Sequence, residues 1–391
     1  MNAPAKRAAA APHPQRELRQ GNRPEFMTIH ELVKKARRNL NDQVWDYLMG
    51  GTETETTMLR NRHALDTIAF RPRVLHDVSA IDASGTLFGH SLRIPVLFAP
   101  VGQMERFHPD GAANSGKAAG EFGIAHMLSS LTAPTLEEVA AVSGDNLRMF
   151  QLYTRGDADW IEGYIERIKD HGYSAFCLTV DSAYYSRRER VLARGHVTTF
   201  RSRVDGFVYQ TRLNWDDVKR IKDTHPDLPL IIKGIATAED TEIALEHGVA
   251  GIYVSNHGGR QLDHGRGAID TLPEIAAVAK GKAALMIDGG FCRGSDIVKA
   301  MAMGADAVGL GKMQGLAMAA DGTAGLVRLL ELLEKEILTC LGLIGATSFA
   351  ELDAKALLRR APAVTSPAAL GAFPLLDIEG EVTGGGYGQG Y

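Results

Sequence analysis

Short runs of β-favouring apolar residues alternate with segments of helical periodicity along most of this 391-residue chain. Eight such runs occur, and each precedes a segment whose apolar residues recur at helical spacing. The predicted strands cover residues 96–99, 123–128, 147–152, 175–180, 230–233, 251–255, 284–287 and 307–310, and the predicted helices cover 112–121, 136–142, 160–169, 215–224, 238–246, 272–278, 295–303 and 317–338. Such alternation implies parallel strands joined by right-handed crossovers.

Two of the predicted helices begin with recognisable caps. Thr135 stands three residues before Glu138, and Thr237 stands three residues before Asp240. A doubly wound open sheet is the competing architecture, but no G-x-G-x-x-G follows the first predicted strand. Eight strands are also the number that closes a barrel. We therefore expect an α/β fold, a (β/α)8 (TIM) barrel with an N-terminal helical segment over residues 27–70.

Composition and charge limit the class of protein. A chain with 45% hydrophobic and 23% charged residues can bury one large core without a second domain. Its net charge of −4 offers no broad cationic surface for nucleic acid, and no apolar run approaches a membrane span. The three cysteines lie far apart with no C-x-x-C pair, which favours a reducing, cytoplasmic compartment and argues against a zinc site.

The two ends of the chain differ in composition from its middle. Residues 1–26 are rich in Ala, Pro and Arg and lack the apolar stretch of a secretory signal. No Ser or Thr precedes Thr28, so a disordered N-terminal arm is favoured over a transit peptide. Residues 27–350 are predicted to form the barrel domain, and residues 351–391 a C-terminal extension with a Gly/Tyr-rich end.

Polar residues gather where the predicted strands end, which is where such barrels carry their chemistry. The loop over residues 288–296 leads from the seventh strand into a helix, so its glycines and helix N-terminus can approach a phosphate, with Arg293 supplying charge. Lys233, at the end of the fifth strand, is costly there unless it faces an anion. Together with a nearby histidine, these features suit a flat, phosphorylated electron acceptor such as FMN.

The loop after the sixth strand carries the strongest local signal, because residues 255–263 read Ser-Asn-His-Gly-Gly-Arg-Gln-Leu-Asp. The glycines beside His257 let a planar ring approach the backbone, and His257 and Arg260 can converge on one small anion. This string resembles the active-site signature of the FMN-dependent L-2-hydroxy acid oxidases and dehydrogenases, the family of glycolate oxidase, lactate oxidase and mandelate dehydrogenase. The resemblance extends over about residues 27–350, through strings at 44–47, 99–102, 128–130, 150–153, 178–181, 187–189 and 233–234.

The resemblance implies oxidation of an L-2-hydroxy acid to the 2-oxo acid, with FMN as cofactor. It implies His257 as the base, oriented by Asp181, while the residues leave open whether His257 takes the α-proton or the hydroxyl proton. Substrate contacts are implied for Tyr47, Tyr153, Arg188, His257 and Arg260, with Tyr153 and Arg260 also catalytic and Arg188 and Arg260 holding the carboxylate. Cofactor contacts are expected at Val101, Gly102, Ser129, Gln151, Thr179, Lys233, Ser255, Asp288, Gly289, Gly290, Arg293, Gly311 and Lys312.

Two positions depart from the family pattern, since Cys292 and Lys312 stand where relatives commonly carry arginine. Lysine cannot form a bidentate fork, so weaker phosphate binding is expected. The expected electron acceptor is oxygen, a quinone or a protein, and the expected assembly is a homo-oligomer, a tetramer by resemblance. The residues also leave open a non-flavin barrel lyase or isomerase acting on a phosphorylated substrate, and a catalytically silent flavin-binding protein.

Overall fold

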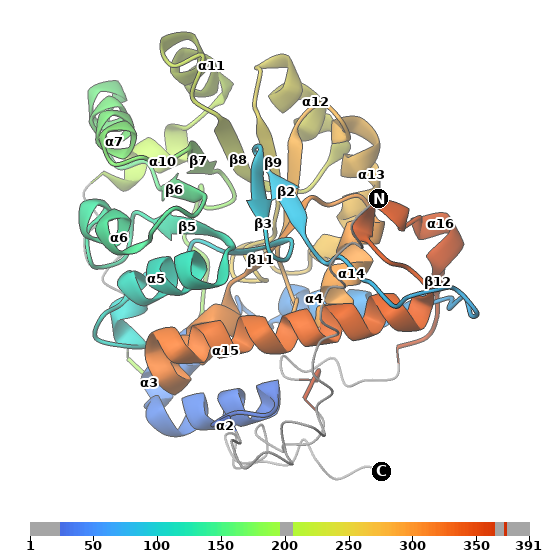
Figure 1. Ribbon diagram of the computed structural model, residues 1–391. Coiled ribbons are helices and arrows are strands. Elements are labelled where there is room, and N and C mark those ends of the chain that lie inside the picture. The colour runs from blue at the N-terminus through green and yellow to red at the C-terminus, as the bar shows by residue number, and fades with distance from the viewer. Residues whose placement is uncertain (1–23, 196–205, 364–370, 374–391) are drawn as a thin grey trace, which may run out of the picture.

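The computed structural model describes residues 24–195, 206–363 and 371–373. A closed barrel of parallel strands lies at its centre (Figure 1), in the order β10-β11-β4-β5-β6-β7-β8-β9. The strands are β4 (Val96–Phe98), β5 (Ala125–Ser129), β6 (Arg148–Leu152), β7 (Ala175–Thr179), β8 (Leu230–Ile235), β9 (Gly251–Val254), β10 (Ala284–Ile287) and β11 (Ala307–Leu310). All the predicted barrel strands are present, and pairing of β11 with β4 closes the ring. The (β/α)8 prediction is confirmed.

Helices alternate with the barrel strands and cover their outer side (Figure 1). They are α5 (Ala112–Phe122), α6 (Leu136–Val142), α7 (Ala158–Asp170), α11 (Trp215–Thr224), α12 (Ala238–Glu246), α13 (Ala268–Ala279), α14 (Gly294–Ala302) and α15 (Lys312–Ile344). The predicted caps are confirmed: the side chain of Thr135 accepts a hydrogen bond from the Glu138 N–H, and that of Thr237 from the Asp240 N–H. Shorter helices follow β4 and β7: η1 (Met104–Arg106), α8 (Glu189–Ala193) and α10 (Phe207–Arg212).

The predicted N-terminal helical segment consists of α2 (Ile29–Asn39), α3 (Asp42–Met49) and α4 (Thr56–Asp66). Helix α2 packs along α15, and α4 packs against α13 (Figure 1). The predicted N-terminal arm lies mostly outside the described residues, but Phe26 at its end is buried, and its carbonyl accepts a hydrogen bond from Arg328. The packed segment therefore begins slightly earlier than the composition indicated.

The N-terminal end of the barrel is closed by a hairpin of β2 (Gly85–Leu87) and β3 (His90–Leu92). Leu87 and Leu92 of this hairpin are buried in the same core cluster as Leu97, Met127 and Met286, which fill the barrel interior. Strands buried on both faces read as continuous apolar runs, which is why they could be recognised in the sequence. The opposite end of the barrel is left for the polar loops.

Part of the predicted C-terminal extension returns to the body of the protein. After η2 (Phe349–Glu351) and α16 (Ala354–Leu357), β12 (Leu358–Arg360) pairs antiparallel with β1 (Ile68–Phe70). Phe373 is buried against the edge of the His30 ring, at 5.3 Å between ring centroids. The Gly/Tyr-rich end lies outside the described residues. No helix in the described ranges combines the length and apolar character needed to cross a bilayer.

Candidate active site

A cavity of about 210 Å³ opens among the loops that follow the barrel strands. Most of the predicted site residues line it, namely Tyr47, Val101, Gly102, Tyr153, Arg188, Lys233, His257, Arg260, Asp288, Gly289, Gly290, Gly311 and Lys312. Asp181 and Ser255 lie behind this lining, in contact with His257 and Lys233. Ser129, Gln151 and Thr179 are buried at the ends of β5, β6 and β7. Barrel closure thus gathers residues from all parts of the chain.

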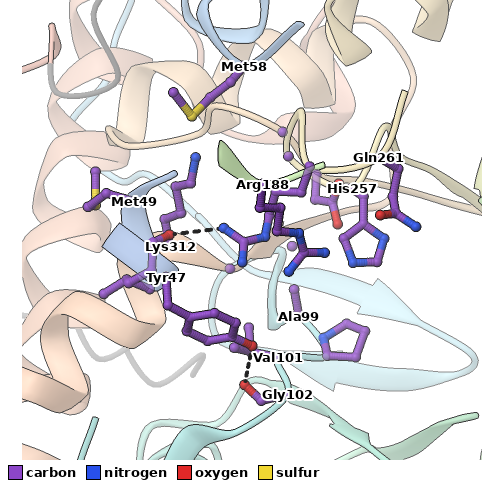
Figure 2. A pocket seen from close by; sticks show the side chains of 18 of the residues that line it. Tyr47, Met49, Met58, Ala99, Val101, Gly102, Arg188, His257, Gln261 and Lys312 are labelled. Atoms are coloured by element: carbon purple, nitrogen blue, oxygen red, sulfur yellow. Dashed lines mark hydrogen bonds between the residues drawn. The ribbon is translucent and has the colours of Figure 1, made fainter. Parts of the chain in front are cut away.

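The backbone of the signature loop is folded tightly at His257. Its φ of 58° lies in the left-handed region, as do those of Gly258 (66°) and Gly259 (73°). A Cβ at Gly259 would lie 2.4 Å from the Cα of Met58, so only glycine lets the loop pack this closely on α4. The His257 N–H donates to the Ser255 hydroxyl at 3.0 Å. A left-handed conformation is uncommon in a residue other than glycine, and here the imidazole faces the cavity (Figure 2).

The two ring nitrogens of His257 have different partners. Nδ1 lies 2.9 Å from Oδ1 of Asp181, and Nε2 lies 3.2 Å from the hydroxyl of Tyr153. Burial lowers the pKa of His257 below its usual value, although Asp181 opposes this shift, and the net effect favours the neutral ring. Burial also acts on Asp181, but the charges of His257 and Lys233 outweigh it and hold the pKa of this carboxyl at about 2. Because a carboxylate only accepts hydrogen bonds, Nδ1 carries the proton and Nε2 is left as the acceptor.

Two arginines face the same cavity. Arg260 donates to the carbonyl of Gly50 at 2.6 Å, and its guanidinium carbon lies 5.2 Å from the centroid of the Tyr47 ring. The Tyr47 hydroxyl in turn donates to the Gly102 carbonyl at 3.1 Å (Figure 2). Burial and the charge of Arg188 lower the pKa of Arg260. Within the described residues neither arginine forms a salt bridge, so the pair offers an uncompensated site for an anion.

Lys233 lies at the centre of a buried polar network. Its Nζ donates to the Ser255 hydroxyl at 3.0 Å, and that hydroxyl donates to Asp288 at 2.6 Å. The carboxylates of Asp181 and Asp288 lie 3.9 and 3.8 Å from Nζ. Burial lowers the pKa of Lys233, but these two carboxylates outweigh it and raise the pKa above its usual value. Lys233 is therefore a permanent positive charge at the floor of the cavity.

Two fully buried side chains, Gln151 and Thr179, carry polar atoms without hydrogen bonds to any described residue. Both polar atoms of the Gln151 side chain and the hydroxyl of Thr179 have no hydrogen-bond partner within the described residues, although both residues are fully buried. Each such unsatisfied group costs about 1–3 kcal/mol. The ring of FMN carries carbonyl and N–H groups that can satisfy an amide and a hydroxyl. Gln151 and Thr179, buried near the ends of β6 and β7, therefore carry polar groups that fit a flavin ring.

The phosphate end of the cavity is built differently from the sequence prediction. Gly289, Gly290, Cys292 and Lys312 line it, whereas Arg293 does not. The guanidinium of Arg293 pairs with Glu336 on α15 at 2.5 Å and lies over the ring of Phe373. The expected phosphate contact of Arg293 is therefore corrected: its charge is turned outward, because a carboxylate from a helix far along the chain holds it. Burial and Arg260 lower the pKa of Lys312 to about 7.

Helix α4 supplies two residues that sequence reasoning missed. Asn61 and Asn256 exchange side-chain hydrogen bonds at 2.9 and 2.7 Å, beside the backbone of Gly289. Arg62 lines the cavity and donates to the Gly290 carbonyl at 3.0 Å, but salt bridges of 2.6 Å to Asp296 and Asp66 neutralise it. No local sequence signal distinguishes Asn61 and Arg62 from residues on the solvent-exposed face of a helix. Only the docking of α4 brings it to the phosphate end.

The closed barrel, the buried Lys233 and the unsatisfied polar groups of Gln151 and Thr179 fit a barrel enzyme that binds a flavin. Residues 36–359 match the model of the family described as FMN-dependent dehydrogenase, and the chain belongs to this family. It is 37% identical over 354 residues to glycolate oxidase 1 of Zea mays, covering 85% of this chain and 95% of the relative.

Solved structures agree with this assignment. The crystal structure of a mandelate oxidase superposes with a TM-score of 0.79 at 34% identity, covering 86% of this chain and 99% of the other. A mutant flavocytochrome b2 with pyruvate bound superposes with a TM-score of 0.81 at 29% identity, covering 88% and 90%. The protein is thus an FMN-dependent enzyme of the 2-hydroxy acid oxidase and dehydrogenase family, and the non-flavin and catalytically silent alternatives are set aside.

Proposed function

We propose that the protein oxidises an L-2-hydroxy acid to the 2-oxo acid, with His257 as the base and with Arg188 and Arg260 binding the carboxylate. Electrons leave through FMN to oxygen or another acceptor. The observation that carries this proposal is the convergence in one cavity of the His257 imidazole and two arginines that form no salt bridge with any described residue.

Bound FMN accepts the two electrons that the α-carbon of the hydroxy acid loses. Gly289, Gly290, Gly311 and Lys312 would hold its phosphate, while Val101, Gly102, Ser129, Gln151, Thr179, Lys233 and Ser255 would contact its ring. The positive charge of Lys233 would stabilise negative charge that develops on the ring during reduction. This role requires a lysine that stays protonated, as the two carboxylates beside it ensure.

His257 would remove the proton from the substrate. Its Nε2 is an acceptor because Nδ1 donates to Asp181, and the same carboxylate would stabilise the imidazolium that forms when Nε2 takes a proton. Either the α-proton or the hydroxyl proton would arrive at this nitrogen. The Tyr153 hydroxyl lies 3.2 Å from Nε2, so it would be close enough to donate to an oxygen of a substrate that faces the same nitrogen. A positioned base of this kind contributes roughly 100- to 10,000-fold to the rate.

Arg188, Arg260 and Tyr47 would orient the substrate. A guanidinium binds a carboxylate through two parallel hydrogen bonds, which fixes the substrate carboxylate and hence its α-carbon. Arg260 is held in place by the Gly50 carbonyl and the Tyr47 ring before any substrate arrives. Leu131, Tyr184 and Tyr185 add apolar and aromatic surface to the cavity. A substrate side chain larger than that of glycolate is compatible with this lining.

The test is anaerobic mixing of the FMN-loaded protein with glycolate, L-lactate, L-mandelate and their D-enantiomers where these exist. Bleaching of the flavin by the L-acids supports the proposal, and reoxidation by oxygen, a quinone or an artificial dye then identifies the acceptor. Bleaching by none of the acids, or only by D-enantiomers, would overturn it.

A further inference from the structure

The barrel interior directly beneath the candidate active site is built around Tyr253 on β9. This side chain is fully buried, and its Cα is in register with Lys233 on β8 and Met286 on β10. Its hydroxyl has no hydrogen-bond partner within the described residues. A buried tyrosine usually finds such a partner, because an unsatisfied buried hydroxyl lowers stability. Phenylalanine would fill the same space without that cost, so the hydroxyl requires an explanation.

The Tyr253 ring reaches across the barrel to β11. A Cβ at Gly309 would lie 2.0 Å from the Tyr253 hydroxyl and 3.3 Å from the Cβ of Asp288. The hydroxyl can occupy this place only because residue 309 is glycine. It therefore lies beside Asp288, a residue of the cavity wall. Burial and then the charge of Asp288 raise the pKa of Tyr253 well above its usual value, so the hydroxyl keeps its proton and can donate it in a hydrogen bond.

Tyr253 also lies close to Lys233, the cation that pairs with Asp288. The Nζ of Lys233 lies 5.5 Å from the centroid of the Tyr253 ring, within the range of a cation–π interaction. The same Nζ lies 3.8 Å from Asp288, whose other oxygen accepts from Ser255 at 2.6 Å. One side chain thus touches the ammonium with its ring face and approaches the carboxylate with its hydroxyl.

We propose that Tyr253 is a positioning residue that raises the reduction potential of bound FMN by acting on Lys233 and Asp288. The inference rests on the proposed function, in which Lys233 faces the flavin. The dipole of the Tyr253 hydroxyl, which lies beside Asp288, offsets part of the charge of this carboxylate, so that less of it compensates the ammonium. More of the Lys233 charge is then available to stabilise electron density on the flavin, an effect that is strong in a low-dielectric interior.

The experiment compares the wild-type holoenzyme with Tyr253→Phe, which keeps the ring and removes only the hydroxyl. The midpoint potential of bound FMN, measured by equilibration with reference dyes, is expected to become more negative. Affinity for sulfite, which reports how readily the flavin accepts electron density, is expected to fall roughly two- to tenfold, the size of effect that one polar interaction has. The limiting rate of flavin reduction by substrate should fall while the substrate Kd stays nearly constant.

Tyr173→Phe is the matched control. Tyr173 is also buried, and its hydroxyl donates to the Leu136 carbonyl at 2.7 Å in the helical layer, away from the cavity. This variant should lose stability without any change in potential. An unchanged potential in Tyr253→Phe, with or without a loss of stability like that of the control, would overturn the inference. A shifted potential in a protein whose flavin no hydroxy acid reduces would support the inference and overturn the proposed function instead.

Discussion

Nδ1 of His257 lies 2.9 Å from Oδ1 of Asp181, although the two residues are 76 positions apart in the chain. This contact fixes the tautomer of the imidazole, since the carboxylate can only accept. The second nitrogen of the ring is thereby left as an acceptor at the cavity, 3.2 Å from the Tyr153 hydroxyl. The predictions for the proton transfer follow from this pair.

His257→Gln should bind FMN normally and lose nearly all reduction by substrate, because the amide keeps polarity but cannot take the proton. The loss is expected to be roughly 100- to 10,000-fold. Anaerobic stopped-flow measurement of flavin reduction checks it. His264→Gln is the matched control, since His264 shares the φ of 58° but does not line the cavity. Reduction of the His257 variant at the wild-type rate would remove this residue from its role.

Asp181→Asn should slow flavin reduction by roughly ten- to a hundredfold, because the imidazolium formed in the reaction loses its carboxylate. The variant should also change the pH profile. Burial lowers the pKa of His257 and Asp181 raises it, so removing the charge lowers this pKa further. The rate falls as pH drops through the pKa of His257, and this acidic limb is expected at lower pH in the variant. A limb displaced upward, or an effect on substrate Kd alone, contradicts the orienting role.

Arg260→Lys should weaken hydroxy acid binding and slow flavin reduction, although the charge is kept. Lysine cannot form the two parallel bonds of a guanidinium, and each charge-assisted bond is worth about 1.5–3 kcal/mol, so the substrate Kd should rise roughly ten- to a hundredfold. The concentration dependence of flavin reduction measures it. The amides of the same acids should be poor substrates of the wild type. Equal rates with acid and amide would show that no carboxylate is clamped.

Cys292→Arg should tighten FMN binding by roughly ten- to a hundredfold, because residue 292 lines the phosphate end of the cavity and the cysteine supplies no charge. The wild type should correspondingly lose part of its FMN on dialysis at high salt. Titration of apoprotein with FMN checks both. Arg293→Gln is the control, and it should leave affinity nearly unchanged because Arg293 pairs with Glu336. If the control loses FMN and Cys292→Arg does not gain it, the structural assignment of this loop is wrong.

FMN affinity should depend on pH through Lys312, whose pKa is lowered to about 7 by burial and by Arg260. Only the protonated ammonium attracts the phosphate. Affinity should therefore be fully present below about pH 7 and fall as pH rises above it, by at most tenfold per unit for one proton. Lys312→Arg, which stays charged, should abolish this dependence. The measurement runs from about pH 6.5 to about pH 9, on either side of the Lys312 pKa. A wild-type FMN affinity that does not change over this range would exclude Lys312 from the phosphate site.

The sequence alone determined the barrel, and most of the site residues that it predicted line the cavity. Parallel strands buried on both faces must be apolar throughout, so their runs and the alternating helices are visible without a structure, and caps such as Thr135 mark where helices begin. The loop that holds His257 and Arg260 is local, so its residues could be recognised as a unit. The ends of individual strands shifted by one or two residues, because hydrogen bonding between neighbouring strands sets them.

Only the tertiary structure decided which charged and polar side chains meet. Arg293 was expected at the phosphate, but Glu336, 43 positions away, holds it outside the cavity. Arg62 reaches the cavity wall only because α4 docks there, and Tyr253 reaches Asp288 only because residue 309 leaves room. Sequence spacing predicts which face of an element a residue occupies. The direction of a long side chain depends instead on partners from distant elements, which only the packed fold brings within a few ångströms.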